Sequence, residues 1–205
     1  IGYATALLFQ KENYKVINLS RSEIPLEGAI HLSVDLSNSN WHEEVTKVFQ
    51  GCLEDADKIS LIHNASKMQS DNVENFNANE LRDVFEVNLV APALLNKMVI
   101  PYMKKGSSIL YVGSTLSEKA VPQMSSYVTT KHGMIGLMRS TCQDLFGRFI
   151  HTACVCPGAT ETEMLQEYVQ GNAEALKMMA GTLSENRLIS PKEIASTLLF
   201  CSQNS

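Results

Sequence analysis

Several classes of protein are excluded by what this 205-residue sequence lacks. It contains no run of 18 consecutive apolar residues, so we predict no membrane-spanning segment. Charged residues make up only 19 % and hydrophobic residues 44 %, a composition unlike that of disordered chains and coiled coils. Basic residues are also few: 17 Lys and Arg against 22 Asp and Glu give a net charge of −5. Nucleic-acid-binding domains usually present a basic face, so we expect no nucleic-acid partner. Because no spanning segment is predicted, we also expect no membrane partner.

Cysteine and histidine are too scattered to predict a disulfide framework or a metal site. The five cysteines are an odd number and form no C-x-x-C pair. They fit small buried side chains in a reducing compartment, so we expect a cytoplasmic protein. The five histidines show no metal-ligand spacing, and no metal is predicted.

Repeats, low-complexity tracts and Pro/Gly-rich linkers are absent as well, which favours a single domain over residues 1–205. Short apolar runs alternate with longer helical patterns. Strands are expected at 15–20, ending near 34, at 59–62, 108–112 and 151–156, and helices at 3–12, 41–53, 78–104, 125–146 and 191–202. This alternation predicts an α/β fold, a Rossmann-type doubly wound parallel sheet with helices on both faces. Ligands of such sheets bind beyond the carboxyl ends of the strands.

Three residues near one predicted strand end have the chemistry of a proton-transfer site. Tyr127 and Lys131 are four residues apart on a predicted helix, so both side chains leave one face. A phenol has a pKa of about 10, and a nearby ammonium is expected to lower that pKa toward neutrality. Ser114 follows a strand and could hydrogen-bond a substrate oxygen beside the phenol. The Tyr–Lys pair alone is common, and a solvated helix face explains it equally well.

Further segments make the signal more specific. The segment YVGSTLSEKAVPQMSSYVTTKHG holds the serine, tyrosine and lysine, and the chain also contains VDLS (Val34–Ser37), HNAS (His63–Ser66), VNLVAP (Val87–Pro92), CPGATETEM (Cys156–Met164) and ISPKEIASTLLFCS. In type and order these segments resemble the short-chain dehydrogenase/reductase family over essentially the whole chain. The resemblance implies an NAD(P)-dependent oxidoreductase that transfers a hydride between the nicotinamide and a carbonyl or secondary alcohol.

The resemblance also implies a role for each catalytic residue. Tyr127 would be the general acid or base, Lys131 would lower its pKa and bind the cofactor ribose, and Ser114 would position the substrate oxygen. Asn88 would hold a water in a proton relay. Pro92 gives Asn88 a separate rationale: it lacks an N–H, so the Asn88 carbonyl loses its helical partner. A kink tolerated only for packing is the alternative.

Cofactor binding is expected at a second set of residues. Besides Tyr127 and Lys131, the family motifs place it at Gly2, Asp35, Leu36, Asn64, Ala65, Ser66, Pro157, Gly158, Thr160 and Thr162. Thr162 would orient the nicotinamide carboxamide, and a helix N-cap is a compatible reading of the same residue. The region from Glu163 to Arg187 would close over the substrate, and a core or interface stripe is the alternative reading of its apolar residues.

The choice of nucleotide depends on the end of the second predicted strand. A carboxylate there would hold the ribose hydroxyls of NAD, yet the stretch from Asn18 to Ser22 contains no acid. Arg21 could bind a 2′-phosphate in the bidentate geometry that a guanidinium favours, with Ser20 and Ser22 adding hydrogen bonds. We therefore predict that NADP(H) is preferred and that NAD(H) is possible. An ordinary surface arginine is the alternative.

The sequence departs from the family pattern in several places. Of the glycine-rich turn that receives the pyrophosphate only Ile1-Gly2 is present, and the final strand is absent, so we expect the chain to omit residues at both ends. Ser66 stands where the family has glycine, and His63 stands where it has asparagine. These departures keep open a non-catalytic nucleotide-binding protein that acts as a partner or sensor.

A nucleotide-sugar epimerase or dehydratase is a second rival to this reading. The chain has no room for a separate sugar-binding domain, which disfavours it. A homodimer or homotetramer is expected, because apolar residues of two helices could cover a partner: Leu94, Leu95, Met98, Met134, Leu137 and Met138. The alternative is that these side chains face the sheet. The substrate is a small carbonyl or alcohol whose identity the sequence does not define.

Overall fold

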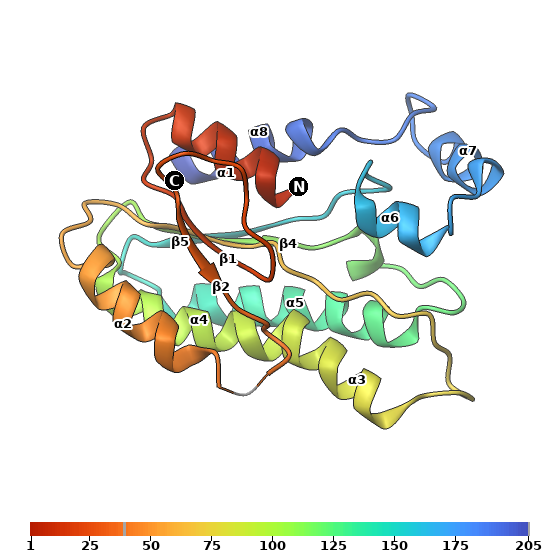
Figure 1. Ribbon diagram of the computed structural model, residues 1–205, viewed down its shortest axis with the longest axis horizontal. Helices are drawn as coiled ribbons and strands as arrows, with labels where there is room; N and C mark the ends of the chain where they lie inside the picture. The colour runs from red at the N-terminus through yellow and green to blue at the C-terminus, as the bar shows by residue number, and fades with distance from the viewer. Residues whose placement is uncertain (39, 205) are drawn as a thin grey trace.

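The computed structural model describes residues 1–38 and 40–204, and they form three layers (Figure 1). Parallel strands make the middle layer. Helices α1 and α8 cover one face, and α2, α4 and α5 cover the other. The strands are β1 (Ile17–Ser20), β2 (Ile30–Ser33), β3 (Ser60–His63), β4 (Ser108–Val112) and β5 (His151–Val155). The helices are α1 (Gly2–Lys11), α2 (His42–Leu53), α3 (Ala78–Phe85), α4 (Ala91–Val99), α5 (Ser125–Asp144), α6 (Glu163–Tyr168), α7 (Ala173–Gly181) and α8 (Pro191–Gln203).

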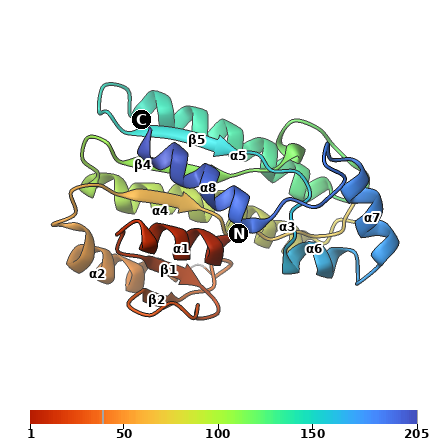
Figure 2. The same cartoon turned by 90° about the horizontal axis from the view of Figure 1, so that it is seen from above.

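All strand pairs in the described chain are parallel, and they form two sheets. One sheet pairs β1 with β2, and the other has the order β3-β4-β5. In the second sheet Leu110 of β4 lies between Ile62 of β3 and Ala153 of β5. Figure 2 shows α1 and α8 side by side above the strands. The predicted α/β class, with a parallel sheet and helices on both faces, is confirmed.

The position of β4 at the centre of its sheet explains why the sequence of this strand is largely apolar. All five of its residues are buried, because each face of the strand meets a helical layer. Ile109 and Tyr111 pack into the larger core cluster, together with Val45 of α2 and Val99 of α4. On the opposite face, β4 packs against α1 and α8 in a smaller cluster.

The helix predicted over 78–104 is interrupted. A π-helical turn (Glu86–Val90) separates α3 from α4, and a 3₁₀ turn (Ile100–Tyr102) follows α4. Pro92 lies in the first turn of α4, where its missing N–H removes a helical donor, and the wider turn before it absorbs that loss.

The same segment, Ala78–Tyr102, is the one described helix that is long and apolar enough to cross a membrane, with a mean hydropathy of 1.3 over its most apolar 18 residues. In this fold its apolar side is used for packing instead. Ala91, Leu95 and Val99 are buried in the larger core cluster. Its properties are therefore those of a core helix.

The apolar face expected to cover a second subunit packs within the chain. Leu95 and Met134 belong to the larger core cluster, and four more side chains pack partly buried against it: Leu94, Met98, Leu137 and Met138. The alternative reading, in which these residues face the sheet, therefore describes this structure better. Oligomeric assembly stays a prediction.

Candidate active site

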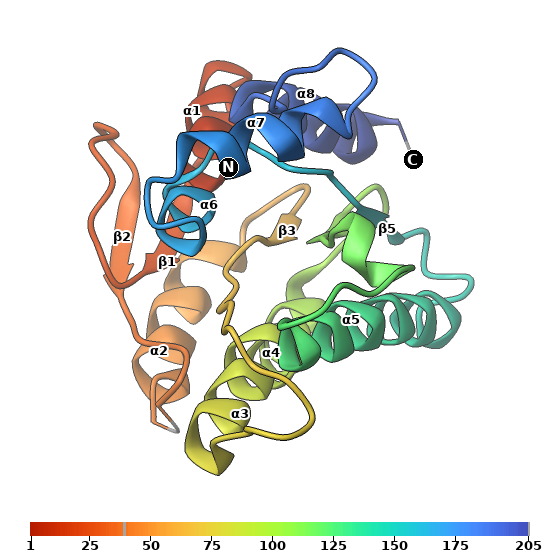
Figure 3. The ribbon, with the colours of Figure 1, turned by 90° about the vertical axis from the view of Figure 1, so that its right-hand side faces the viewer.

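A cavity of about 2440 Å³ opens at the carboxyl ends of the strands and extends between β1 and β3 as far as residues 55–58, at the amino end of β3. Figure 3 looks onto this end, where α6 lies on one side and α3 to α5 lie on the other. Most of the predicted site residues line the cavity: Gly2, Ser20, Arg21, Asp35, Leu36, Asn64, Ala65, Ser66, Ser114, Tyr127, Lys131, Pro157, Gly158, Thr160 and Thr162. Ser22 and Asn88 do not line it. The fold thus brings together residues that are up to 160 positions apart in the sequence.

Tyr127 is held at the start of α5 by an acidic side chain from another segment. The carboxylate of Asp71, which is buried, accepts a hydrogen bond from the Ser126 N–H at 2.9 Å. An acid in this position satisfies a free backbone donor and complements the positive end of the helix. Asp71 therefore fixes the first turn of α5 and, with it, the base of the tyrosine side chain.

Ser114 follows β4 and begins a 3₁₀ turn (Thr115–Ser117). Its Oγ accepts from the Leu116 N–H at 3.1 Å, and the Ser117 hydroxyl accepts from the Ser114 N–H at 3.2 Å. This reciprocal capping box limits the freedom of the Ser114 side chain. Ser114 and Tyr127 both line the cavity.

Burial raises the pKa of Tyr127, and hydrogen bonds with Ser114 and Ser66 act against burial. The balance lies above the ordinary value of a phenol, because the charged form loses its hydration inside the protein. The sequence predicted instead that Lys131 would lower this pKa. That prediction is wrong for the groups present in the structure: burial is the largest cause of the shift in the Tyr127 pKa, and Lys131 is not among the causes.

Lys131 reaches under the tyrosine ring from the same helix face. Its Nζ lies 5.4 Å from the Tyr127 ring centroid and donates to the Val112 carbonyl at 2.9 Å. The side chain is 2 % exposed, and burial lowers the pKa of its ammonium to about 8. A buried lysine with a mobile proton near neutral pH is a common feature of catalytic sites.

Asn88 is fully buried in the π-helical turn and uses both ends of its amide. Its Oδ1 accepts from the Lys67 N–H at 2.7 Å and from the Ser66 hydroxyl at 3.2 Å. Its Nδ2 donates to the Lys67 carbonyl at 2.9 Å and to the Thr130 hydroxyl at 3.0 Å. Thr130 in turn donates to the Tyr127 carbonyl at 2.9 Å. Asn88 therefore ties the loop after β3 to the helix that carries the tyrosine and lysine.

His63, the last residue of β3, is buried in the core, where its ring forms a hydrogen bond with Asn96. Its Nε2 lies 2.7 Å from the Asn96 Oδ1, and Asn96 donates to the Tyr111 hydroxyl at 2.7 Å. Burial lowers the pKa of His63 to about 4, so the ring is neutral at pH 7. Neutral imidazole carries one donor and one acceptor, and the donor satisfies Asn96.

The end of β1 is an exposed turn with its own hydrogen bonds. The Ser20 hydroxyl donates to the Ser22 carbonyl at 2.6 Å, and the Ser33 hydroxyl donates to the Arg21 carbonyl at 3.3 Å. Arg21 takes part in none of the ion pairs formed by the residues that the structure describes. The guanidinium is therefore free to meet an anion at the edge of the cavity.

Asp35 shapes the neighbouring loop through its own turn. Its Oδ1 accepts from the N–H of Ser37 at 2.9 Å and from the Ser37 hydroxyl at 2.7 Å. These bonds are the largest cause of a lowered Asp35 pKa, to which the positive charges of Arg21 and Lys67 add. The carboxylate is therefore ionised at neutral pH, at the same edge of the cavity as Arg21.

The segment after β5 runs along the other end of the cavity. The Pro157 carbonyl accepts from the Thr115 N–H at 2.9 Å, and the Thr160 hydroxyl donates to the Gly158 carbonyl at 3.0 Å. A Cβ at Gly158 would come within 2.8 Å of a Leu183 methyl, so a side chain here would require Leu183 to shift.

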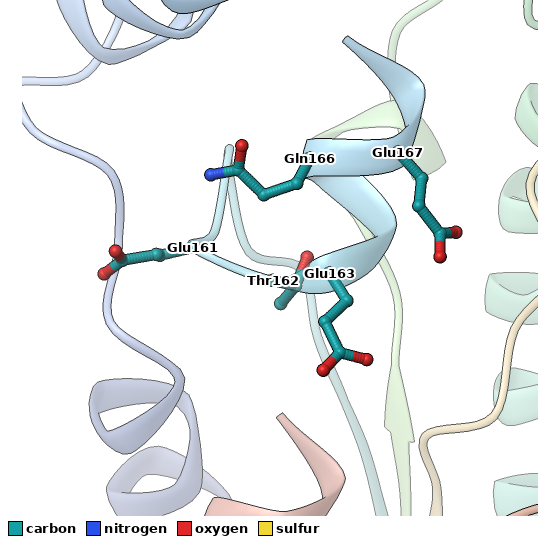
Figure 4. Close-up of a pocket in the computed structure, with 5 residues that line it drawn as sticks. All are labelled: Glu161, Thr162, Glu163, Gln166 and Glu167. Carbon is teal, nitrogen blue, oxygen red and sulfur yellow. The ribbon is translucent and has the colours of Figure 1, made fainter. Parts of the chain in front are cut away.

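Thr162 is the N-cap of α6, and its hydroxyl accepts from the Leu165 N–H at 3.3 Å. Thr162 lines a hollow of about 430 Å³. Figure 4 shows that the carboxylates of Glu161 and Glu163, which also line it, point in different directions. No cluster of metal-binding side chains occurs in the described part of the chain.

The cavity suits a long, anionic ligand such as a dinucleotide. It runs from the free guanidinium of Arg21 to the N-cap hydroxyl of Thr162, past Lys131. Gly2 lines the cavity, and a Cβ at this position would come within 2.7 Å of the side-chain amide of Asn64. A side chain at Gly2 would therefore narrow the space beside the loop after β3.

Three contributors to the site were missed by sequence reasoning. Asp71, Thr130 and the backbone of Lys67 hold the elements that carry Tyr127, Lys131 and Asn88, and none of the three belongs to a recognised motif. Asp71 gave a weak signal, since it is an acid in a polar loop. Thr130 gave none, because its partner Asn88 lies 42 residues away.

Comparisons with known proteins agree with this geometry. Residues 1–205 match a family model described as enoyl-(acyl carrier protein) reductase. An uncharacterized oxidoreductase of Thermotoga maritima is 28 % identical, over 98 % of this chain and 84 % of its own length. The 3-oxoacyl-[acyl-carrier-protein] reductase FabG of the same organism is 26 % identical, over 98 % and 85 %. A structure of 4-hydroxyisoleucine dehydrogenase complexed with NADH superposes with a TM-score of 0.88 at 24 % identity, covering 99 % of this chain and 86 % of that one.

Proposed function

Because the chain belongs to the short-chain dehydrogenase/reductase family of nicotinamide-dependent oxidoreductases, we propose that it reduces a carbonyl or oxidises a secondary alcohol, with Tyr127 as the general acid or base. The observation that carries this proposal is the meeting of Ser114, Tyr127 and Lys131 in one cavity. A phenol held between hydroxyls, above a buried ammonium, is suited to exchanging a proton with a substrate oxygen.

Each side chain has a part that its position supports. In reduction the Tyr127 phenol donates its proton to the carbonyl oxygen, and the Ser114 hydroxyl holds that oxygen in place. Lys131 presents a positive charge beneath the ring, which favours the phenolate left behind. Asn88 fixes the loop after β3 against α5 and, with its backbone carbonyl in the wide turn, provides a site for a relay water.

The cofactor supplies or accepts the hydride when it is bound. We propose that Arg21, Ser20 and Ser22 hold the adenosine end and favour NADP(H), with NAD(H) as the second choice. The support is the unpaired guanidinium of Arg21 and the lack of an acid between Asn18 and Ser22. The other expected cofactor contacts are Gly2, Asp35, Leu36, Asn64, Ala65, Ser66, Pro157, Gly158, Thr160 and Thr162.

Assembly and location are further parts of the proposal. We expect a homodimer or homotetramer, which light scattering of the purified protein measures directly. A cytoplasmic location is supported by the five cysteines, all of which are free thiols in the structure.

The decisive experiment follows NADPH and NADH absorbance with a panel of four substrates. These are an acetoacetyl thioester, a bicyclic ketone, an aliphatic aldehyde and, in the direction of oxidation, an aldohexose. Wild-type protein should turn over at least one of them, and Tyr127→Phe should lose about 10²–10⁴-fold in turnover. Full activity of the Tyr127→Phe protein would refute the assignment. Cofactor binding without turnover of any substrate would favour a nucleotide-binding partner or sensor.

A further inference from the structure

Two cysteines that the proposed reaction does not use lie together at the end of β5. Cys154 is in the strand and Cys156 directly follows it, so the two side chains leave the same face. Their sulfur atoms are 3.7 Å apart, and both side chains are free thiols that are only partly buried. These two residues, the β5 dithiol, are therefore already brought together by the strand.

The geometry of the β5 dithiol is compatible with a disulfide bond. Two residues along a strand have Cα atoms about 6.6 Å apart, and disulfides join Cα atoms about 4.4–6.8 Å apart. The sulfurs have to approach from 3.7 Å to about 2.05 Å. Cys156 can make this movement because pairing with β4 ends at Val155, and the Cys156 backbone forms no hydrogen bond with another backbone group in the described chain.

The β5 dithiol lies against Gly113, the residue that follows β4. A Cβ at Gly113 would come within 2.8 Å of both sulfurs, so the thiols occupy the space that a side chain would fill. The Gly113 N–H also donates to the Val155 carbonyl, between the two cysteines, at 2.8 Å. A bend of β5 at Val155 would therefore act directly on Gly113.

Gly113 in turn connects two parts of the candidate active site. The residue before it, Val112, accepts the hydrogen bond from the Lys131 Nζ at 2.9 Å, and the residue after it is Ser114. A shift of Gly113 would thus move the support of the lysine and the base of the serine together.

We propose that the β5 dithiol is an oxidation site, at which a peroxide forms a Cys154–Cys156 disulfide that reversibly slows the proposed hydride transfer. Formation of the disulfide needs only the two thiols and the peroxide. The slowing rests on the proposed function, because it assumes that Lys131 and Ser114 take part in turnover.

The oxidation proceeds in two balanced steps. The Cys156 thiolate attacks one peroxide oxygen, the O–O bond breaks, and the departing hydroxide takes up the proton that the thiol released, which gives a sulfenic acid and one water. The Cys154 sulfur then attacks the sulfenic sulfur, the S–O bond breaks, and the hydroxide leaves as a second water with the Cys154 proton. Two electrons pass from the sulfurs to the peroxide. Cys154 reacts second, because burial raises the pKa of its thiol and keeps it protonated.

Peptide mapping of the wild-type protein tests the site without any substrate. The protein is treated with hydrogen peroxide, remaining thiols are alkylated with iodoacetamide, and tryptic peptides are weighed. Peptide 149–177 contains both cysteines of the β5 dithiol, whereas the other three cysteines lie on different peptides. We expect this peptide to be unalkylated and two hydrogen atoms lighter than the dithiol form, and dithiothreitol should restore two alkylation sites. Two alkyl groups on the treated peptide, or a sulfinic acid in place of the disulfide, would overturn the proposal.

Activity measurements test the slowing. With a substrate that the panel identifies, kcat/KM should fall about tenfold after peroxide and recover with dithiothreitol, since a displacement of 1 Å near reacting groups can cost about 10²-fold in rate. Cys156→Ser and Cys154→Ala should each keep their own starting rate after peroxide. Cys142→Ser, which removes an exposed thiol of α5, should lose and regain activity as wild type does.

The outcomes separate this inference from the proposed function. A disulfide with no change in rate, or an equal loss of rate in wild type and Cys156→Ser, would overturn the slowing and leave the proposed function in place. A disulfide in a protein that turns over no substrate even when reduced would support the oxidation site and count against the proposed function.

Discussion

The two ends of the cavity are built in different ways. The proposed catalytic cluster comprises Asn88 of the π-helical turn, Ser114 after β4, and Tyr127 and Lys131 of α5. Within it Asn88 and Lys131 are 0 % and 2 % exposed. The β1 turn, defined as residues 20–22, is held by hydrogen bonds of its own backbone and serines, and Arg21 is exposed.

This difference separates what the two ends can do. Buried, mutually bonded groups keep a fixed geometry and have displaced pKa values, as proton transfer requires. An exposed guanidinium pays little desolvation and selects among ligands by charge and shape. We therefore expect substitutions in the catalytic cluster to alter stability and turnover, and substitutions in the β1 turn to alter only the choice of nucleotide.

Lys131→Met is the variant for which this comparison predicts the largest effect on stability. The pKa of Lys131 falls from 10.5 in its ordinary state to about 8 in the fold, so the unfolded chain binds the proton more tightly. Between these two pH values the free energy of unfolding of the wild-type protein therefore increases as the pH rises. The difference between wild type and Lys131→Met should therefore change by about 3 kcal/mol from pH 8 to pH 10.5.

Urea unfolding at several pH values measures that difference. Lys97→Met, which removes an exposed lysine of α4, is the matched control, and its curve should run parallel to that of wild type. If the Lys131→Met curve also ran parallel, the ammonium would not be desolvated in the folded protein, and the contrast between the two ends would weaken.

Asn88→Ala tests the connection inside the catalytic cluster. The variant leaves the Lys67 N–H and the Thr130 hydroxyl without their buried partner, at a cost of about 2 kcal/mol in the free energy of unfolding. Denaturant unfolding at pH 7 measures the cost. Asn79→Ala, at an exposed position of α3, should change stability by less than about 0.5 kcal/mol. Equal effects of the two variants would show that the Asn88 network contributes nothing to stability.

Much of the fold and the chemical groups of the site could be predicted from local pattern. β4 is a short apolar run followed directly by Gly113 and Ser114, so both the strand and the candidate serine were recognisable. The spacing of Tyr127 and Lys131 gave their shared helix face. In each case a single short stretch of sequence contains all the information that the prediction needs.

Features that depend on contacts between distant segments could not be predicted. The sequence identified Asn88, but its bonds to Lys67 and Thr130 require α5 to pack beside the π-helical turn. Burial reversed the expected direction of the Tyr127 pKa, and no sequence pattern gives the extent of burial. Helix α6 was foreseen only through Thr162 as its possible N-cap. Helix α7 was missed, although Asn172 is a recognisable N-cap: its Oδ1 accepts from two backbone N–H groups at the start of α7.

Arg21→Ala gives the smallest expected effect and addresses the other end of the cavity. Loss of a charged hydrogen bond to a 2′-phosphate should lower the preference for NADPH over NADH about tenfold, or ~1.4 kcal/mol. The free energy of unfolding should stay within about 0.5 kcal/mol of wild type, because the guanidinium has no ion-pair partner to lose among the described residues. The ratio of kcat/KM for the two nucleotides measures the effect, with the exposed Arg139→Ala as control. An unchanged ratio would make Arg21 an ordinary surface residue, whereas a loss of stability would mean that the β1 turn is built more like the catalytic cluster than its exposure indicates.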